Sequence, residues 1–186
     1  ALAIFGVIIY HAKIYLGAQP FLKGGYLGVD LFFVISGYLM TLIISDQCQI
    51  GNFNFKDFLL RRLRRIFPAL LFICIISLPI MYFLIMPADL SEQIKSIVSS
   101  IFFFSNFFYS AISQEYAAET TLIKPFIHTW SLSVEMQFYF ILPFIILFSF
   151  RKKMNLLSVF TILIIIFFLY SVLSNIYIQD LNFYNT

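Results

Sequence analysis

Apolar runs separated by short polar stretches extend along the whole chain. Four of them approach the ~20 helical residues that cross a bilayer core of ~30 Å, namely Gly28–Ile44, Phe67–Met86, Ser131–Phe150 and Leu156–Asn175. Ala1–Tyr10 is about half that length; we interpret it as a membrane helix that lacks its start, with an interfacial helix as the alternative. Because only helices or closed barrels satisfy the backbone in lipid, the pattern predicts an all-α, polytopic transmembrane helical bundle of about five to six membrane segments.

The stretches between these runs predict shorter elements. Ser45–Lys56 has the composition of a polar loop, and Asp57–Ile66 predicts a short basic amphipathic helix. Pro68 suits the first turn of a new helix that follows it. Ala88–Ser100 is mildly amphipathic, whereas Ile101–Ile112 is apolar but short for a crossing. For Ile101–Ile112, a re-entrant or tilted segment therefore competes with a full crossing.

The basic residues predict the orientation of the helices. Two clusters, Arg61–Arg65 and Arg151–Lys153, are both expected on the cytoplasmic side. An even number of crossings must then separate them, which holds if Ile101–Ile112 does not cross. In that layout the outer half of the membrane contains the loop at Gly24 and Gly25 together with His11, Asp30, His128 and Glu135.

Composition narrows the class of protein. The chain has 186 residues, of which 61% are hydrophobic, 20% aromatic and 11% charged. An average soluble domain is about a quarter charged, so a soluble domain is excluded. The net charge is only +3, and basic clusters that lie against a membrane favour lipid rather than nucleic acid as a partner. We expect one integral membrane domain over residues 1–186, truncated at both ends, because the chain begins inside an apolar run.

Cysteine and metal-ligand patterns add no further chemistry. Cys48 and Cys74 lie far apart in the sequence, one in a polar stretch and one in an apolar run. Their spacing predicts no disulfide framework. No zinc-ligand spacing is present, so we expect no metal site.

A polar stretch at the start of one membrane run holds most of the candidate chemistry. If the run is helical from Ser131, Glu135 and Tyr139 follow at intervals of four residues and share one face. His128 and Trp130 lie just above that face, so all of these side chains are expected to converge on one membrane-embedded patch. An ionisable group inside a membrane costs roughly 2.5–3.5 kcal/mol on insertion scales, which favours a functional role.

Two histidines and two carboxylates fall on the same side of the membrane. A histidine near its ordinary pKa can take and return a proton, and a carboxylate can orient it. Glu135 could serve His11 or His128 in this way, and the sequence leaves both open. An isolated interfacial histidine is more often a hydrogen-bonded cap, but the grouping favours catalysis. Asp30 has the alternative of a helix-start acid stabilised by the helix dipole.

Four arginines cluster in Arg61–Arg65. Arginines three residues apart share a helix face, and the guanidinium fork suits bidentate contacts with phosphate. A cytoplasmic cofactor that carries several phosphates would fit this surface. Ordinary topogenic charge and binding to anionic lipid head groups are the alternative.

Four motifs occur in a fixed order: Tyr10-His11-Ala12, the stretch from Gly24 to Tyr38, Arg61 to Pro68, and His128 to Tyr139. In these motifs the chain resembles the membrane acyltransferase family 3, which O-acetylates surface polysaccharides, peptidoglycan and related glycans. The resemblance implies a larger membrane domain of which this chain is roughly the N-terminal half. A family arginine falls at the position before Ala1, and Met136 replaces a second acid.

The resemblance also implies roles for single residues. His11 becomes the main catalytic histidine, and Arg62 and Arg65, next to Arg61 and Arg64, serve the side of the acyl donor. Further catalytic roles fall to Asp30, His128 and Glu135. The resemblance implies a role for Trp130 as well, which we expect at the acceptor. From the residues themselves we also expect acceptor contacts from Tyr139, Gly24 and Gly25, with a simple turn as the alternative for the two glycines.

The expected reaction is the transfer of an acyl group, most simply acetyl, from cytoplasmic acyl-CoA to a hydroxyl of an outward-facing glycan. The expected location is a bacterial inner membrane. Two other classes remain as alternatives. Half of a membrane transporter would also place polar residues within the membrane, although repeated broken helices are not found. A non-catalytic membrane anchor would tolerate the loss of both histidines.

Overall fold

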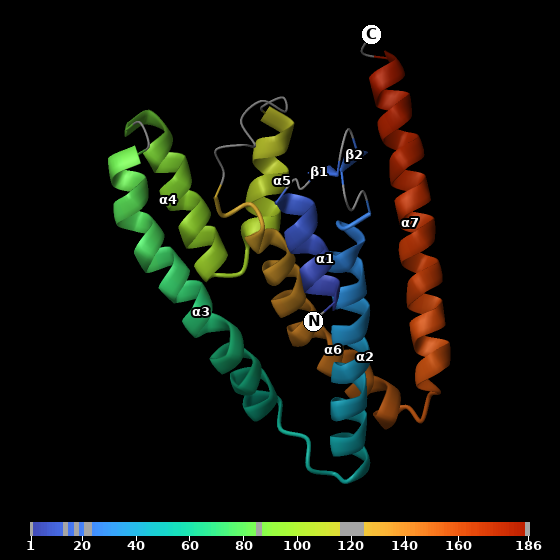
Figure 1. The fold of residues 1–186 in the computed structure, drawn as a ribbon. Helices are drawn as coiled ribbons and strands as arrows, with labels where there is room; N and C mark the ends of the chain where they lie inside the picture. The colour runs from blue at the N-terminus through green and yellow to red at the C-terminus, as the bar shows by residue number, and fades with distance from the viewer. Residues whose placement is uncertain are drawn as a thin grey trace. The chain divides into compact units, whose positions relative to one another are not determined.

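The computed structural model describes residues 2–12, 15–16, 19–20, 24–84, 87–115 and 125–184. This part of the chain forms seven helices (Figure 1): α1 (Leu2–His11), α2 (Leu27–Gln49), α3 (Phe55–Leu84), α4 (Pro87–Ile101), α5 (Ser105–Glu115), α6 (Thr129–Arg151) and α7 (Leu156–Tyr184). Two-residue strands, β1 (Tyr15–Leu16) and β2 (Gln19–Pro20), pair antiparallel between α1 and α2. The all-α prediction is confirmed.

Four of the described helices are long and apolar enough to cross a membrane. They are α2, α3, α6 and the Leu156–Ile176 part of α7. The expected five to six segments also counted Ala1–Tyr10 and Ile101–Ile112. The first of these corresponds to α1, which has 10 residues, and the second is divided between two helices. The expected number is therefore approximate, while the polytopic helical class holds.

One predicted boundary is wrong. The sequence indicated a basic helix, Asp57–Ile66, followed by a separate span that begins near Pro68. The structure has instead a single 30-residue helix, α3, with Pro68 and Pro79 inside it. A proline removes one backbone hydrogen bond, but in membrane helices neighbouring groups satisfy the freed carbonyl, so the helix continues. The arginines consequently belong to a spanning helix. The predicted loop Ser45–Lys56 is also shorter, because α2 continues to Gln49.

The segment Ile101–Ile112 does not form a crossing helix. α4 ends at Ile101, and α5 begins at Ser105 after a turn in which Phe103 has a φ of 57°. α4 packs against α3, and α5 packs against α4. Figure 1 shows the two as a helical hairpin whose turn lies part of the way along α3. Two short helices joined by a turn fit the re-entrant alternative, and α3 and α6 are the long apolar helices on either side of them.

Pairs of polar side chains connect this hairpin to α6. The hydroxyl oxygens of Ser105 and Ser133 lie 2.7 Å apart, and both residues are fully buried. The amides of Asn106 and Gln137 exchange hydrogen bonds of 3.2 Å and 3.0 Å. Small polar residues let membrane helices approach closely and bond across the contact. The serines of α5 and α6 therefore have a packing role.

Glycines bring α1 against the beginning of α2. A Cβ atom at Gly28 would lie 2.3 Å from the carbonyl oxygen of Ala3, and one at Gly25 would lie 2.5 Å from that of Gly6. Such distances leave no room for a side chain. α1 therefore runs along α2 at backbone contact, and this contact positions α1 beside the pockets described below.

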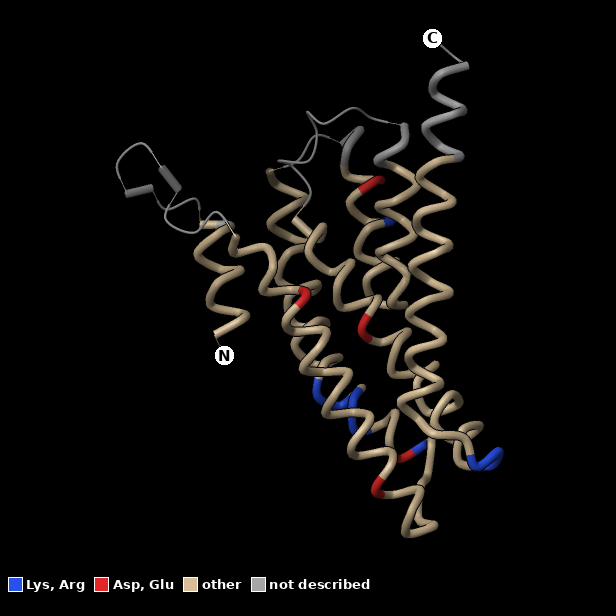
Figure 2. The backbone as a smooth tube through the Cα atoms, turned by 90° about the vertical axis from the view of Figure 1, so that its right-hand side faces the viewer, with Lys and Arg blue, Asp and Glu red and all other residues tan. Residues whose placement is uncertain are grey.

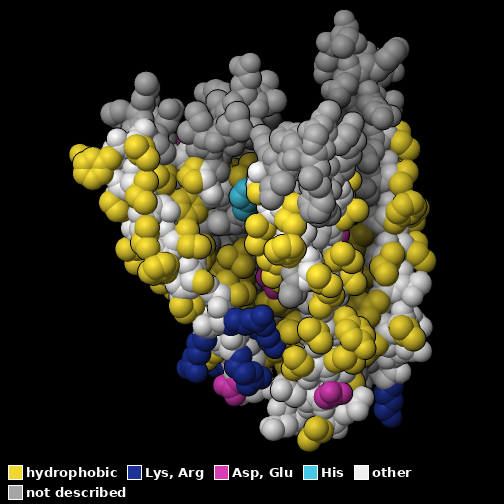
Figure 3. Space-filling model, in the orientation of Figure 1, with side chains coloured by type: hydrophobic (Ala, Val, Ile, Leu, Met, Phe, Trp, Pro, Cys, Tyr) yellow, Lys and Arg dark blue, Asp and Glu magenta, His cyan; other side chains and the backbone are white. Residues whose placement is uncertain are grey.

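Many of the basic side chains are clustered. Figure 2 shows the basic residues of α3 in one stretch near the beginning of that helix. In the space-filling view they form a patch at the edge of a mainly hydrophobic surface (Figure 3). This distribution fits a helix end at a membrane–water boundary.

The chain divides into two compact units, Ala1–Pro143 and Phe144–Thr186. The first holds every pocket discussed here. In the second, the most apolar 18-residue window of α7 contains no buried residue. Helices that are apolar on all sides and exposed suit contact with lipid or with further membrane helices.

Candidate functional site

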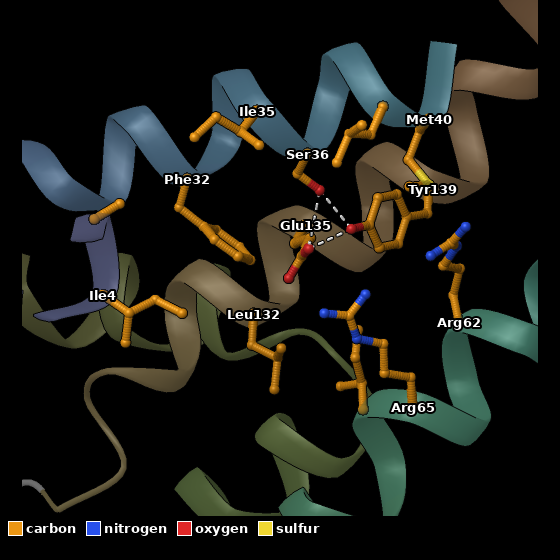
Figure 4. A pocket seen from close by; sticks show the side chains of 13 residues that line it. Ile4, Phe32, Ile35, Ser36, Met40, Arg62, Arg65, Leu132, Glu135 and Tyr139 are labelled. Atoms are coloured by element: carbon orange, nitrogen blue, oxygen red, sulfur yellow. Dashed lines mark hydrogen bonds between the residues drawn. The ribbon is translucent and has the colours of Figure 1, made fainter. Parts of the chain in front are cut away.

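An inner pocket of about 430 Å³ lies between α1, α2, α3 and α6. Most of its lining is apolar. Its polar side chains come from three helices and are shown in Figure 4: Ser36 from α2, Arg62 and Arg65 from α3, and Glu135 and Tyr139 from α6. An apolar cavity with a few converging polar groups is the usual form of a small-molecule site.

Glu135 is the hydrogen-bonded centre of this pocket. Its side chain is 6% exposed, and that of Tyr139 is 4% exposed. Ser36 Oγ donates to Glu135 Oε1 at 3.1 Å, and the Tyr139 hydroxyl donates to the same oxygen. The two hydroxyl oxygens lie 2.5 Å from each other. Figure 4 shows the other carboxylate oxygen turned away from both hydroxyls, into the open part of the pocket.

Arg62 lies beside this group. Its guanidinium carbon is 5.6 Å from the centre of the Phe58 ring and 6.0 Å from the centre of the Tyr139 ring. Contacts of this kind hold an arginine by cation–π attraction and fix the direction of its fork. The Nε atom of Arg62 is buried and has no hydrogen-bond partner among the described residues. A buried donor of this sort can donate to a partner such as a ligand oxygen or an ordered water.

The four arginines of α3 do not share one environment. Arg62 and Arg65, three residues apart, both line the inner pocket, as the predicted helix face required. Arg62 is partly buried and Arg65 is exposed, as are Arg61 and Arg64, which line none of the described pockets. The sequence grouped all four as donor-binding candidates, and the structure places two of them at the cavity.

An outer pocket of about 700 Å³ lies between α1, α2 and the turn that precedes α6. It holds three of the predicted site residues, Asp30, His128 and Trp130. Aromatic rings surround them: Tyr10 and Tyr26 also line the pocket and meet edge to face at 5.8 Å. The Trp130 ring lies 6.3 Å from that of Phe33 on α2.

The two pockets follow one another along the same helices. On α2, Val29 lines the outer pocket and Phe32 the inner one, about one helical turn or ~5 Å apart. On α6, Ser131 lines the outer pocket and Leu132 lines the inner one. The single patch expected from the sequence is thus two adjacent pockets.

The physical reason for this division lies at the start of α6. The helix begins at Thr129, so His128 belongs to the preceding turn. Glu135 and Tyr139 are about two and three turns beyond His128, where the helix faces α2 and α3. One short stretch of sequence therefore contributes to two pockets at different depths.

The other predicted site residues are His11, Gly24 and Gly25. His11 ends α1, and its side chain lies outside the described residues. Gly24 is exposed in the turn before α2, whereas Gly25 is buried against Gly6 of α1. The packing of α1 is thus sufficient to explain why position 25 has no side chain. Among the described residues, no three His, Cys, Asp or Glu side chains gather as a metal site would require.

Ser36 is a site residue that the sequence did not reveal. It occurs beside Gly37 in an apolar run, where a small pair of residues is typical of close helix packing. Gly37 does lie close to another helix, since a Cβ there would be 3.6 Å from the Phe138 ring. The partner of the Ser36 hydroxyl is 99 positions away, so no local pattern could have identified it.

The chain matches one family model over its full length and curated relatives over most of it. The family model described as "Acyltransferase domain" matches residues 1–186. The O-acetyltransferase OatA of Staphylococcus aureus, from strain NCTC 8325 and likewise from strain COL, is 41% identical over 155 residues, which are 82% of this chain and 24% of the relative. A second protein of strain COL, provisionally named an O-acetyltransferase, is 37% identical over 148 residues, or 78% of this chain and 23% of the relative. The chain spans about a quarter of the length of these curated relatives. No solved structure matches it.

Proposed function

Because the chain belongs to the acyltransferase-domain family, the membrane acyltransferase family 3 that its motifs resemble, we propose that it carries out O-acyl transfer within the membrane. The donor in this proposal is cytoplasmic acyl-CoA, with acetyl as the acyl group. The acceptor is a hydroxyl of a cell-envelope or exported glycan. The name of the relative OatA supports transfer of acetyl to oxygen. The observation that carries the proposal is the inner pocket, where two arginines and a buried carboxylate face one cavity.

Arg62 and Arg65 form the donor side. Phosphate oxygens of coenzyme A would give the unpartnered Nε of Arg62 an acceptor, and guanidinium groups bind phosphate with paired hydrogen bonds. By the positive-inside rule, this end of α3 faces the cytoplasm. From Met40 to Phe32, both in the lining, the pocket follows α2 outward for about 12 Å of helix. A donor that enters at the arginines therefore extends toward the outer pocket.

The outer pocket forms the acceptor side. Its aromatic rings at Tyr10, Tyr26 and Trp130 offer apolar faces, and Asp30 and His128 offer polar atoms. A sugar presents the complementary surface, because its ring has apolar C–H faces and a rim of hydroxyls. Sites of this kind use aromatic side chains for contact area and a few polar groups for orientation.

His11 is the proposed general base. It follows Ile8 and Tyr10, which line the outer pocket, on the same helix. In the step we propose, the acceptor hydroxyl loses its proton to the imidazole as its oxygen bonds to the acyl carbon. The carbon–sulfur bond breaks, and the thiolate of coenzyme A takes up a proton. Positioned bases of this kind typically contribute factors of about 10² to 10⁴ to a rate.

Transfer of radiolabelled acetyl from acetyl-CoA to membrane glycan by the full-length protein tests this function. The protein is expressed in a bacterial inner membrane, its proposed location. Label in the glycan fraction that depends on the protein supports acyl transfer. Export of glycan without label would favour the transporter alternative, and the absence of both would favour a non-catalytic anchor.

A further inference from the structure

The contact between α2 and α6 centres on three oxygen atoms. Ser36 Oγ, the Tyr139 hydroxyl and Glu135 Oε1 are all in hydrogen-bond contact with one another. All three side chains are buried, with at most 9% of any of them exposed. Both hydroxyls reach the same carboxylate oxygen, although an ionised carboxylate has acceptor sites on two.

The consequence concerns the second oxygen of Glu135. No described residue bonds to Oε2, and Figure 4 shows it pointing away from both hydroxyls into the cavity, toward which the Arg65 side chain also reaches. The arginines offer only donors. The hydroxyls of Ser36 and Tyr139 are already engaged by Oε1. Oε2 is therefore the hydrogen-bond acceptor that this pocket presents to a ligand.

We propose that Ser36 and Tyr139 are positioning residues that fix the Glu135 carboxylate so that Oε2 accepts a hydrogen bond from an N–H group of the acyl donor. This inference rests on the proposed function, because it takes an acyl-CoA to occupy the inner pocket. The arm of coenzyme A carries amide N–H groups between its phosphates and its sulfur. An arm that starts at Arg62 and Arg65 and runs outward along α2 passes Glu135 on the way.

The roles within the group differ. Glu135 contacts the donor, whereas Ser36 and Tyr139 act through Glu135. Two hydrogen bonds to one oxygen hold the carboxylate in a single rotamer, so that less conformational freedom is lost when the donor binds. Loss of either hydroxyl frees the carboxylate to turn away from the ligand. The donor should then bind less tightly, while the acceptor, which occupies the outer pocket, is unaffected.

The test measures binding of radiolabelled acetyl-CoA to the purified full-length protein in nanodiscs. Ser36→Ala and Tyr139→Phe should each raise the Kd for acetyl-CoA about 5- to 10-fold, the equivalent of one lost hydrogen bond. Glu135→Gln should do the same, and Ser36→Ala added to Glu135→Gln should cause little further loss. Ser36→Thr keeps the hydroxyl and should restore binding. Tyr139→Phe keeps the ring against Arg62, so it tests the hydroxyl even if Ser36→Ala folds poorly.

Ser133→Ala is the matched control. Ser133 is also a buried serine on α6, two residues before Glu135, but its hydroxyl bonds to Ser105 of α5. Its loss removes the interhelical contacts with the hydroxyl and the backbone N–H of Ser105 without touching the pocket, so the Kd for acetyl-CoA should stay within about two-fold of the wild-type value.

The binding measurements distinguish a failure of this inference from a failure of the proposed function. Equal weakening by Ser133→Ala and Ser36→Ala would reduce Ser36 to a packing residue and overturn the inference. Unchanged binding in Ser36→Ala and Tyr139→Phe would overturn it as well, while leaving the proposed function intact. A wild-type protein that binds no acetyl-CoA would instead refute the donor side of the proposed function, and the inference with it.

Discussion

At the scale of single residues, the register of one helix separates side chains that are chemically identical. Arg62 and Arg65 line the inner pocket, whereas Arg61 and Arg64 on the same turns of α3 line none of the described pockets. All four carry the same charge at the same end of a spanning helix. A role in membrane orientation would involve all four equally, whereas binding of a ligand in the cavity concerns only the first pair. The two explanations can therefore be separated by experiment.

Replacement of Arg62 and Arg65 by glutamine should weaken the binding of acetyl-CoA by about 10- to 100-fold, because two charge-assisted hydrogen bonds to phosphate are lost. Lysine at both positions should restore binding poorly, since it offers a point charge in place of a fork. Equilibrium binding of radiolabelled acetyl-CoA to the full-length protein measures the effect.

The double replacement Arg61→Gln with Arg64→Gln removes the same charge from positions outside the described pockets and should have a much smaller effect. Equal losses in the two double variants would mean that general positive charge, and not the cavity, holds the donor.

The proposed role of His11 as a general base leads to a second prediction for a single residue. His11→Ala in the full-length protein should lower acetyl transfer at least about 100-fold, because the acceptor hydroxyl loses its base. The amount of protein in the membrane and its affinity for acetyl-CoA should both stay unchanged, since the donor occupies the inner pocket. Labelled glycan and bound donor are measured on the same preparation. Transfer at the wild-type rate would remove His11 from the mechanism.

At the scale of elements, the site depends on how α1 lies against α2. α1 contributes Ala3 and Ile4 to the inner pocket and Ile8 and Tyr10 to the outer one. It is held there at backbone contact by glycines of the following segment, Gly25 and Gly28. This contact fixes which side chains of α1 reach each pocket.

Gly28→Ala should disturb this contact. The added methyl group would lie 2.3 Å from the carbonyl oxygen of Ala3, and overpacking of this kind costs typically about 1–3 kcal/mol. We expect a lower melting temperature of the full-length protein in detergent and reduced acetyl transfer. Gly24→Ala is the control, because its Cβ would be 3.8 Å from the nearest atom, a side-chain carbon of Leu27. Equal stability of the two variants would show that the close approach of α1 is not required.

At the scale of the whole molecule, the mechanism depends on which helices cross the membrane. The first unit contains α2, α3 and most of α6 as long apolar helices, with the α4–α5 hairpin between the last two. If the hairpin enters and leaves on one side, an even number of crossings separates Arg61–Arg65 from Arg151–Lys153. The positive-inside rule is then satisfied by both clusters. In this layout, the segment before α6 and the outer pocket would face away from the cytoplasm.

Labelling of single cysteines tests this layout in a background that lacks Cys48 and Cys74. Asn52, exposed in the turn between α2 and α3, should as cysteine stay protected from an impermeant thiol reagent until the membrane is opened. A cysteine in place of Thr121, which lies outside the described residues between α5 and α6, should be labelled on intact cells. Protection of both would mean that the hairpin crosses, and His128 would then move to the cytoplasmic side.

What the sequence by itself determined is the class of the molecule and the chemical kinds of its site residues. Runs of about 20 apolar residues have only one stable form in lipid, so the helical membrane fold follows from hydropathy alone. The pairing of Arg62 with Arg65 follows from the helical period. Both conclusions depend on local patterns, the length of apolar runs and the helical period, which can be recognised in the sequence alone.

Only the tertiary structure decided which of these residues meet. Ser36 and Glu135 are 99 positions apart, and their hydrogen bond exists because α2 and α6 touch at that level. The separation of Glu135 from His128 into two pockets depends on where α6 begins and on which helix each turn faces. The continuity of α3 through Pro68 likewise depends on its surroundings. Contacts between distant segments are selected by the packing of the whole bundle, and no local pattern encodes them.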